Sequence, residues 1–131
     1  MDQATLSVGL ARAGFILYPT SYPETGCLTV MKAMAMGAIP ITSQYTMSVL
    51  PDLTSGFDMG PGEKLTPEIA AHNEHMVEWV AMWTESVVRA VHWAQENVLS
   101  AMHLRARMRG ATRSRFTWER TAGQVLDLLK M

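Results

Sequence analysis

Glu24, which precedes an expected helix, is the residue whose position most clearly suggests chemistry. In the stretch PETGCLTVMKAMAMGAIPIT, Glu24 is followed by Gly26 and then by an apolar run of helical length that ends at Gly37. A helix start exposes unpaired N–H groups and the positive end of the helix dipole, which favour an anion such as phosphate. A carboxylate beside that anion would accept hydrogen bonds from sugar hydroxyls instead. The pattern therefore indicates a nucleotide-sugar pocket.

The same residues have an interpretation that needs no ligand. Glu24 or Thr25 can cap the helix, where a carboxylate interacts favourably with the dipole. On spacing alone, this capping interpretation is favoured over the sugar contact. Cys27 follows at the helix start, where a thiol can act as a nucleophile, but the sequence places no histidine beside it. We therefore expect no cysteine chemistry.

Two other patterns could bind a ligand, and both have simpler explanations. His72, His75 and Glu78 are spaced so that one helix face could reach a metal ion, but the spacing matches no established ligand pattern. The run HLRARMRGATRSR, residues 103–115, is rich in arginine. A charge run on a helix is usually a solvated face, and this one has no interleaved exposed aromatic side chains. We expect neither a metal site nor nucleic-acid binding.

The composition narrows the class of protein. The 131 residues suffice for a single domain. Eleven Lys and Arg against 12 Asp and Glu give a net charge of -1, which favours neither nucleic acid nor anionic membranes. One cysteine fits a reducing compartment, and no apolar run reaches the roughly 20 residues of a membrane span. Because the start also lacks a secretory signal pattern, we expect a cytoplasmic protein.

Residues 1–50 are expected to form a strand–helix–strand unit. A short helix over about Gln3–Ala13 should end at Gly14, and the apolar run Phe15–Pro19 reads as a buried strand. The helix that begins near Glu24 should end at Gly37, and Ala38–Thr42 is again strand-like. Such a unit has parallel strands and a right-handed crossover.

The rest of the chain is expected to be a loop followed by closing helices over 67–131. The loop, 51–66, is rich in Pro and Gly, with one helical turn at Met47–Leu50 just before it. Thr66 and Pro67 should begin a long helical stretch that can break near Gln95–Asn97, and Thr117 can cap a last helix. The apolar stripe of this stretch requires a cover, and its members are Val77, Trp79, Val80, Ala81, Trp83, Thr84, Val87, Val88, Val91 and Trp93.

Two stretches, YPTSYPETGCLTVMKAMAMGAIPITS and FTWERTAGQVLDLL, carry a resemblance to a known family. The first resembles the donor-binding signature of retaining GT-B glycosyltransferases, group 1 or family 4-like, the class that includes glycogen and sucrose synthases. The second is similar to the C-terminal helix of that class. The resemblance implies an α/β, partial Rossmann-like fragment of the GT-B donor-binding domain, with about two parallel strands and a mostly helical remainder.

The resemblance also implies a role for each site residue. Glu24 matches the acid that contacts and orients the donor sugar during transfer with retention. Lys32 stands where the family has a second glutamate that holds the ribose hydroxyls; a lysine there either accompanies a phosphate or, as is favoured, faces solvent. The backbone expected to lie against the donor phosphates is that of Thr25, Gly26, Cys27 and Leu28.

We therefore expect the C-terminal portion of a glycosyltransferase that uses a nucleotide sugar, an acceptor that the sequence does not identify, and no metal or other cofactor. The family's preceding strands, with a glycine-containing loop and an Arg/Lys pair, are not in this sequence. The N-terminal part of the parent enzyme is thus an expected partner. The chain alone is expected to be inactive and to self-associate through its unpaired strand edges and uncovered helices.

Two alternatives belong to other functional classes. A non-catalytic helical interaction module would use the Trp/Val face to bind a protein partner, with the strand–helix–strand unit as its scaffold. A complete small phosphate-binding α/β protein is disfavoured, because two strands are too few for a covered parallel sheet.

Overall fold

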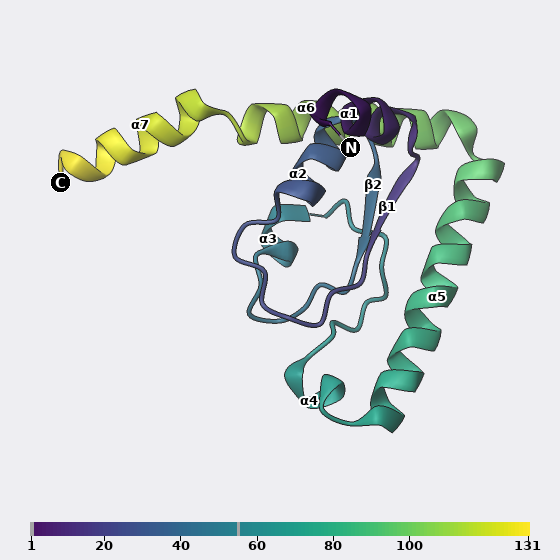
Figure 1. The fold of residues 1–131 in the computed structure, drawn as a ribbon. Helices are drawn as coiled ribbons and strands as arrows, with labels where there is room; N and C mark the ends of the chain where they lie inside the picture. The colour runs from purple at the N-terminus through teal and green to yellow at the C-terminus, as the bar shows by residue number, and fades with distance from the viewer. Residues whose placement is uncertain (1, 55) are drawn as a thin grey trace.

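A two-stranded parallel sheet lies at the centre of the first half of the chain. The computed structural model describes residues 2–54 and 56–131. Strand β1 (Phe15–Tyr18) pairs with β2 (Ile39–Thr42), and helix α2 (Leu28–Ala35) connects them. The predicted parallel strand–helix–strand unit is confirmed. The protein is α/β, with a small sheet and a mostly helical remainder (Figure 1).

The outer edge of β2 is covered by a following loop, whereas the described residues leave the outer edge of β1 open. They pair in register from Phe15 opposite Ile39 to Tyr18 opposite Thr42. Every residue of β2 is buried, and its outer edge is covered because the N–H of Met59 donates to the Pro40 carbonyl at 3.0 Å. Among the described residues, β1 has a strand partner on one side only. The open edge of the sheet is therefore that of β1.

Asp58 closes the carboxyl end of β2. Its carboxylate accepts hydrogen bonds from both the backbone N–H and the hydroxyl of Thr42, and from the N–H of Gly60 at 2.8 Å. A Cβ atom at Gly60 would lie 2.7 Å from the Thr42 carbonyl oxygen, closer than side-chain carbons approach. Glycine is required here because the loop must pass directly against the strand.

The helices beside the sheet begin and end close to the predicted positions, with one exception. Helix α1 (Gln3–Arg12) stops just before Gly14, as expected. Helix α2 has eight residues rather than about eleven, and Cys27 occupies its N-cap position without a side-chain cap bond. The prediction that Glu24 or Thr25 caps the helix is wrong, because both lie in the loop before Cys27.

Gly37 ends α2 as the sequence predicted. Its φ of 93° lies in the left-handed region that glycine adopts without strain. The N–H of Gly37 donates to the Met34 carbonyl at 3.0 Å, and the N–H of Ala38 donates to the Ala33 carbonyl at 2.9 Å. These two bonds make a Schellman motif, which satisfies carbonyls of the last turn and directs the chain into β2.

The segment predicted as the loop 51–66 contains a short helix, α3 (Leu50–Thr54), so that boundary is wrong. The single turn expected at Met47–Leu50 does not form there, because Met47 has a positive φ of 72° that is incompatible with a right-handed helix. The Ser48 hydroxyl accepts from the Leu50 N–H at 3.2 Å and so starts the helix three residues later than Met47.

Four helices complete the chain: α4 (Pro67–Ala70), α5 (Asn73–Glu96), α6 (Val98–Arg115) and α7 (Trp118–Leu129). Thr66 caps α4 as predicted, but α4 has only four residues, and the long helix begins at Asn73.

The other predicted helix boundaries of this region are confirmed. The break near Gln95–Asn97 falls at Asn97. The Thr117 hydroxyl accepts from the Arg120 N–H at 3.1 Å, which is the expected cap of α7. Capping by the Thr117 side chain therefore sets the start of α7.

The core forms where α2 and α6 meet the sheet. Val30 and Met34 of α2 are buried against Ile39, Leu50 and Met108, and α6 packs on α2. A separate small core holds α5 to the loops. It contains the fully buried indole of Trp79, whose N–H donates to the Glu63 carbonyl at 3.1 Å, and its other buried members are Tyr45 and Leu65.

Arginines of α6 bind carbonyls at the ends of other helices. Arg105 donates to the Gly37 carbonyl at 2.6 Å and to the Ala13 carbonyl at 3.2 Å. Arg113 donates to the Ala35 carbonyl at 2.9 Å. The predicted solvated face is therefore wrong for Arg105, which is half-buried, whereas Arg113 stays exposed as predicted. A helix C-terminus carries unpaired carbonyls and partial negative charge, and a guanidinium satisfies both.

The apolar stripe predicted on α5 is only partly covered. Trp79, Ser86 and Ala90 face the body and are buried. The neighbouring stripe, which includes Val80 and Val88, is about half exposed in the structure. None of the residues of α7, all of which are described, is buried, and α7 extends away from the sheet beyond the end of α6 (Figure 1). These faces lack a partner within the described part of the chain.

Replacing Arg105 by glutamine is expected to destabilise the fold by about 1–3 kcal/mol, because two helix-end carbonyls lose a charged donor. Arg120→Gln, an exposed change on α7, is the matched control and should alter the free energy of unfolding by less than about 0.5 kcal/mol. Urea denaturation of both variants measures the difference. Equal stability of the two variants would contradict the assignment.

We expect the chain to associate through the uncovered stripe of α5. Val80→Gln with Val88→Gln should lower the associated fraction at micromolar concentration, because both side chains are about half exposed and glutamine is a good helix former. Glu78→Gln, on an exposed position of the same helix, should not. Light scattering measures the mass, and a wild-type monomer would count against the expectation.

Candidate functional site

Residues 24–28 of the predicted site run from the loop after β1 to the first residue of α2, and Lys32 lies within α2. The connecting loop leaves β1 at Tyr18, passes the carboxyl end of the sheet and reaches Cys27 (Figure 1). In open parallel sheets, ligands bind at this edge, where helix N-termini point toward the crevice. The structure gathers residues 24–28 at this edge.

Glu24 is held at both its side chain and its backbone. The phenol of Tyr18 donates to Oε1 of Glu24 at 2.5 Å. The Glu24 carbonyl accepts from the Val49 N–H at 2.8 Å, which ties the loop to the segment before α3. The residue is half-buried. Its carboxylate is therefore a fixed acceptor at the edge of the sheet and not a free surface charge.

Tyr18 is the site residue that the sequence did not single out. Its side chain comes from the last position of β1, opposite Thr42. Interaction with the Cys27 thiol, then hydrogen bonds with Glu24 and Tyr22, raise the pKa of Tyr18 above its ordinary value. The phenol therefore keeps its proton and remains a donor across the neutral range. The sequence did contain a signal for Tyr18, because a tyrosine lies at the end of the predicted strand, at the edge of the sheet where ligands bind.

The start of α2 presents N–H groups beside this carboxylate. The first helical bond runs from the Met31 N–H to the Cys27 carbonyl at 3.1 Å, so the preceding N–H groups have no acceptor within the helix. Thr25, Gly26 and Leu28 are exposed, and a Cβ atom added at Gly26 would meet no atom within 4 Å. An anion can thus approach the backbone closely.

The side chains of Cys27 and Lys32 do not add a reactive group to the carboxyl edge of the sheet. The Cys27 thiol is 4% exposed and belongs to the core beneath α2. Lys32 is exposed, as the favoured interpretation expected, and its ammonium donates to Oε1 of Gln3 at 3.0 Å. This contact joins α2 to α1. The structure therefore brings Glu24 together with the backbone of 25–28 and places the Lys32 side chain in a contact between helices.

The histidine pattern changes once the helices are located. His72 precedes the first residue of α5, so it does not share one regular helix with His75 and Glu78, contrary to the expected spacing. The two imidazole rings instead meet edge to face, with centroids 5.3 Å apart. Among residues 2–54 and 56–131, no group of three His, Cys, Asp or Glu side chains is placed to hold a metal ion.

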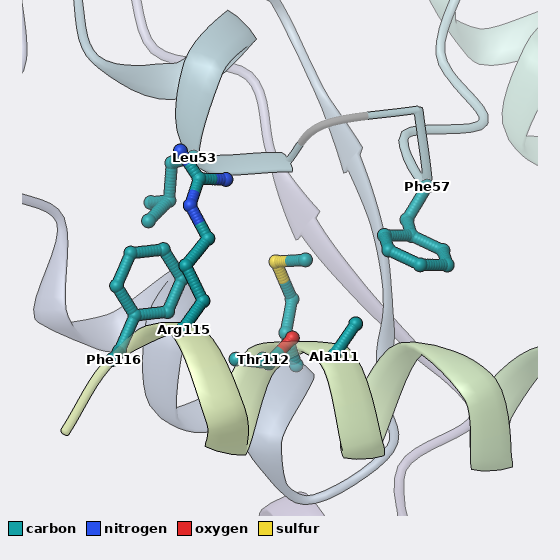
Figure 2. Close-up of a pocket in the computed structure, with 7 residues that line it drawn as sticks. Leu53, Phe57, Ala111, Thr112, Arg115 and Phe116 are labelled. Carbon is teal, nitrogen blue, oxygen red and sulfur yellow. The ribbon is translucent and has the colours of Figure 1, made fainter. Parts of the chain in front are cut away.

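An apolar pocket of about 290 Å³ lies near the C-terminal end of α6. Figure 2 shows Leu53, Phe57 and Phe116 around it, with the Arg115 side chain at its rim. Arg115 is engaged by α3, because it donates to the Asp52 carbonyl at 2.8 Å. Since its lining is mainly apolar and includes no carboxylate, this pocket offers little to orient a polar ligand.

Comparison with known proteins adds no family to this description. No family model, curated protein or solved structure matches the chain. In the part of the chain that the structure describes, no helix is long and apolar enough to cross a membrane. The chemistry of the site must therefore be inferred from the geometry of residues 18–28.

The Tyr18 contacts predict a change in stability at alkaline pH. Because the pKa of Tyr18 is raised above 10, the unfolded chain loses this proton first, and stability falls as the pH rises above about 10. The wild-type free energy of unfolding should therefore fall more steeply than that of Tyr18→Phe. The difference should be below about 1.4 kcal/mol per pH unit, because solvent screens part of the interaction. Urea denaturation at pH 9 to 11 measures it; equal slopes would contradict the assignment.

Proposed function

We propose that this chain is the C-terminal, donor-binding part of a retaining glycosyltransferase, and that Glu24 with the start of α2 forms the half-site for a nucleotide sugar. The observation that carries the proposal is the fixed carboxylate of Glu24, held by Tyr18 at 2.5 Å, beside unpaired helix N–H groups at the carboxyl end of a parallel strand. The resemblance of residues 18–43 to the donor-binding signature supports the same assignment.

The two parts of this half-site suit the two parts of such a donor. The backbone N–H groups of Gly26, Cys27 and Leu28 favour the diphosphate, through hydrogen bonds and the positive end of the α2 dipole. The carboxylate of Glu24 accepts hydrogen bonds from hydroxyls of the sugar. A carboxylate next to a diphosphate is otherwise unfavourable, because like charges repel. A neutral, hydroxyl-bearing group between the carboxylate and the phosphates would relieve that repulsion.

The same arrangement favours the transition state of sugar transfer. As the bond to the sugar breaks, negative charge builds on the departing nucleoside diphosphate. N–H groups that are already fixed at the start of α2 would stabilise that charge without reorganisation, which is usually the largest contribution to catalysis. Glu24 fixes the orientation of the sugar and does not donate a proton. An N-terminal part of the parent enzyme would complete the site and carry the acceptor, in the cytoplasm, where a lone reduced cysteine is common.

A nuclear magnetic resonance titration tests the proposed half-site. The chain is titrated with three pairs of ligands: uridine diphosphate and its glucose conjugate, adenosine diphosphate and its glucose conjugate, and guanosine diphosphate and its mannose conjugate. We expect one pair to shift the amides of Gly26, Cys27 and Leu28. Glu24→Ala should weaken binding of that pair's sugar conjugate by roughly tenfold or more and leave the bare diphosphate unchanged, because only the sugar contact is lost.

The control is Glu78→Ala, which removes an exposed carboxylate from α5 and should change neither affinity. Unshifted amides in the folded wild-type chain would reject the half-site. Equal weakening of conjugate and bare diphosphate by Glu24→Ala would reject the role of Glu24 in sugar recognition.

A second candidate, a helical protein-interaction module, is favoured by the uncovered faces of α5 and α7. Val80 and Val88 are about half exposed, and Trp118 at the start of α7 is 86% exposed. Faces of this kind on a stable body mark interaction surfaces. Under this function, Glu24→Ala would leave partner binding intact, whereas changes at Val80 and Val88 would remove it.

A further inference from the structure

Tyr18 and Glu24 form a pair whose geometry is set by the sheet. Tyr18 is the last residue of β1, and its backbone is paired in register with Thr42 of β2. Its phenol therefore projects from a fixed strand end to Oε1 of Glu24, six residues further along the chain. The Glu24 backbone is fixed separately, because its carbonyl accepts from the Val49 N–H at 2.8 Å. The Glu24 side chain is thus held by the end of β1, and its backbone is held by the segment before α3.

Among the residues that the structure describes, hydrogen bonds reach one oxygen of this carboxylate. In the described part of the chain, the hydrogen bonds of the Glu24 side chain involve Oε1 alone. Fixing a glutamate side chain costs conformational entropy, and the Tyr18 bond brings about that ordering before a ligand arrives. The second oxygen, Oε2, is left as an oriented acceptor.

We propose that Tyr18 is a positioning residue, which orients Glu24 so that Oε2 accepts a hydrogen bond from a hydroxyl of the donor sugar. This inference rests on the proposed function and deepens it, because it names the group that makes the half-site selective for the sugar part of the donor. With Oε1 already accepting from Tyr18, Oε2 is the oxygen that offers its full acceptor capacity to a ligand. Tyr18 itself does not touch the ligand.

This role differs from a purely structural one in what its loss should affect. If Tyr18 only stabilised the loop, its removal would disturb the N–H groups of residues 26–28 as well, and binding of any diphosphate would weaken. If it orients Glu24, the diphosphate keeps its contacts and only the sugar conjugate loses affinity. The ratio of the two affinities therefore separates the roles.

The test measures both affinities in Tyr18→Phe, with Tyr22→Phe as the matched control, using the ligand pair that binds wild type best. Tyr22 also contacts the Tyr18 phenol but leaves the bond to Glu24 in place. We expect Tyr18→Phe to weaken the sugar conjugate by roughly tenfold and the bare diphosphate by less than about twofold, and Tyr22→Phe to change neither by more than about twofold.

A double variant supplies the second readout. Adding Tyr18→Phe to Glu24→Ala should cause no further loss for the sugar conjugate, because Tyr18 acts only through Glu24. Additive losses, equal weakening of both ligands, or unchanged selectivity in Tyr18→Phe would each overturn the positioning role while leaving the half-site standing. Absence of binding by wild type to every ligand pair would overturn the half-site and the positioning role together.

Discussion

The hydrogen bonds from α6 arginines to helix-end carbonyls hold this small fold together. A sheet of two short strands buries too little surface to order the surrounding helices by itself. Arg105 reaches carbonyls at the ends of both α1 and α2, and one of these bonds joins residues 92 positions apart. Removing the Arg105 guanidinium would leave helix-end carbonyls without a donor where the packed helices limit access of water. These few hydrogen bonds therefore matter more for stability than their number suggests.

These bonds also explain how α2 can present its other end to a ligand. At its C-terminus, the Schellman motif at Gly37 and the guanidinium of Arg105 satisfy the carbonyls. At its N-terminus, Cys27 occupies the cap position and makes no side-chain cap bond, so the first N–H groups stay open. One end of the helix is thus fully engaged by the fold, while the other keeps its hydrogen-bonding capacity for something outside it.

Sequence patterns predicted the features that depend on local chemistry. Gly37, Thr66 and Thr117 act on neighbours within a few residues, and each ends or caps a helix where expected. Long-range contacts were beyond such patterns. The bond from Tyr18 to Glu24 replaced the predicted cap, because a rigid strand end brought a phenol to the carboxylate. Arg105 left the predicted solvated face for the same kind of reason, since partners distant in sequence lie close in the fold.

The uncovered faces of α5 and α7 are structurally separate from the proposed donor half-site. Glu24 is fixed by β1 and by the segment before α3, neither of which involves α5 or α7. A partner that covered the exposed stripe of α5 would therefore leave the Tyr18–Glu24 pair unchanged. A partner that paired with the open edge of β1 would act differently, because it would restrain the strand from which Tyr18 projects and reduce the freedom of that phenol. Such a partner would therefore act on the proposed half-site through Tyr18, since the residue that ends the open strand is also the one that holds the carboxylate.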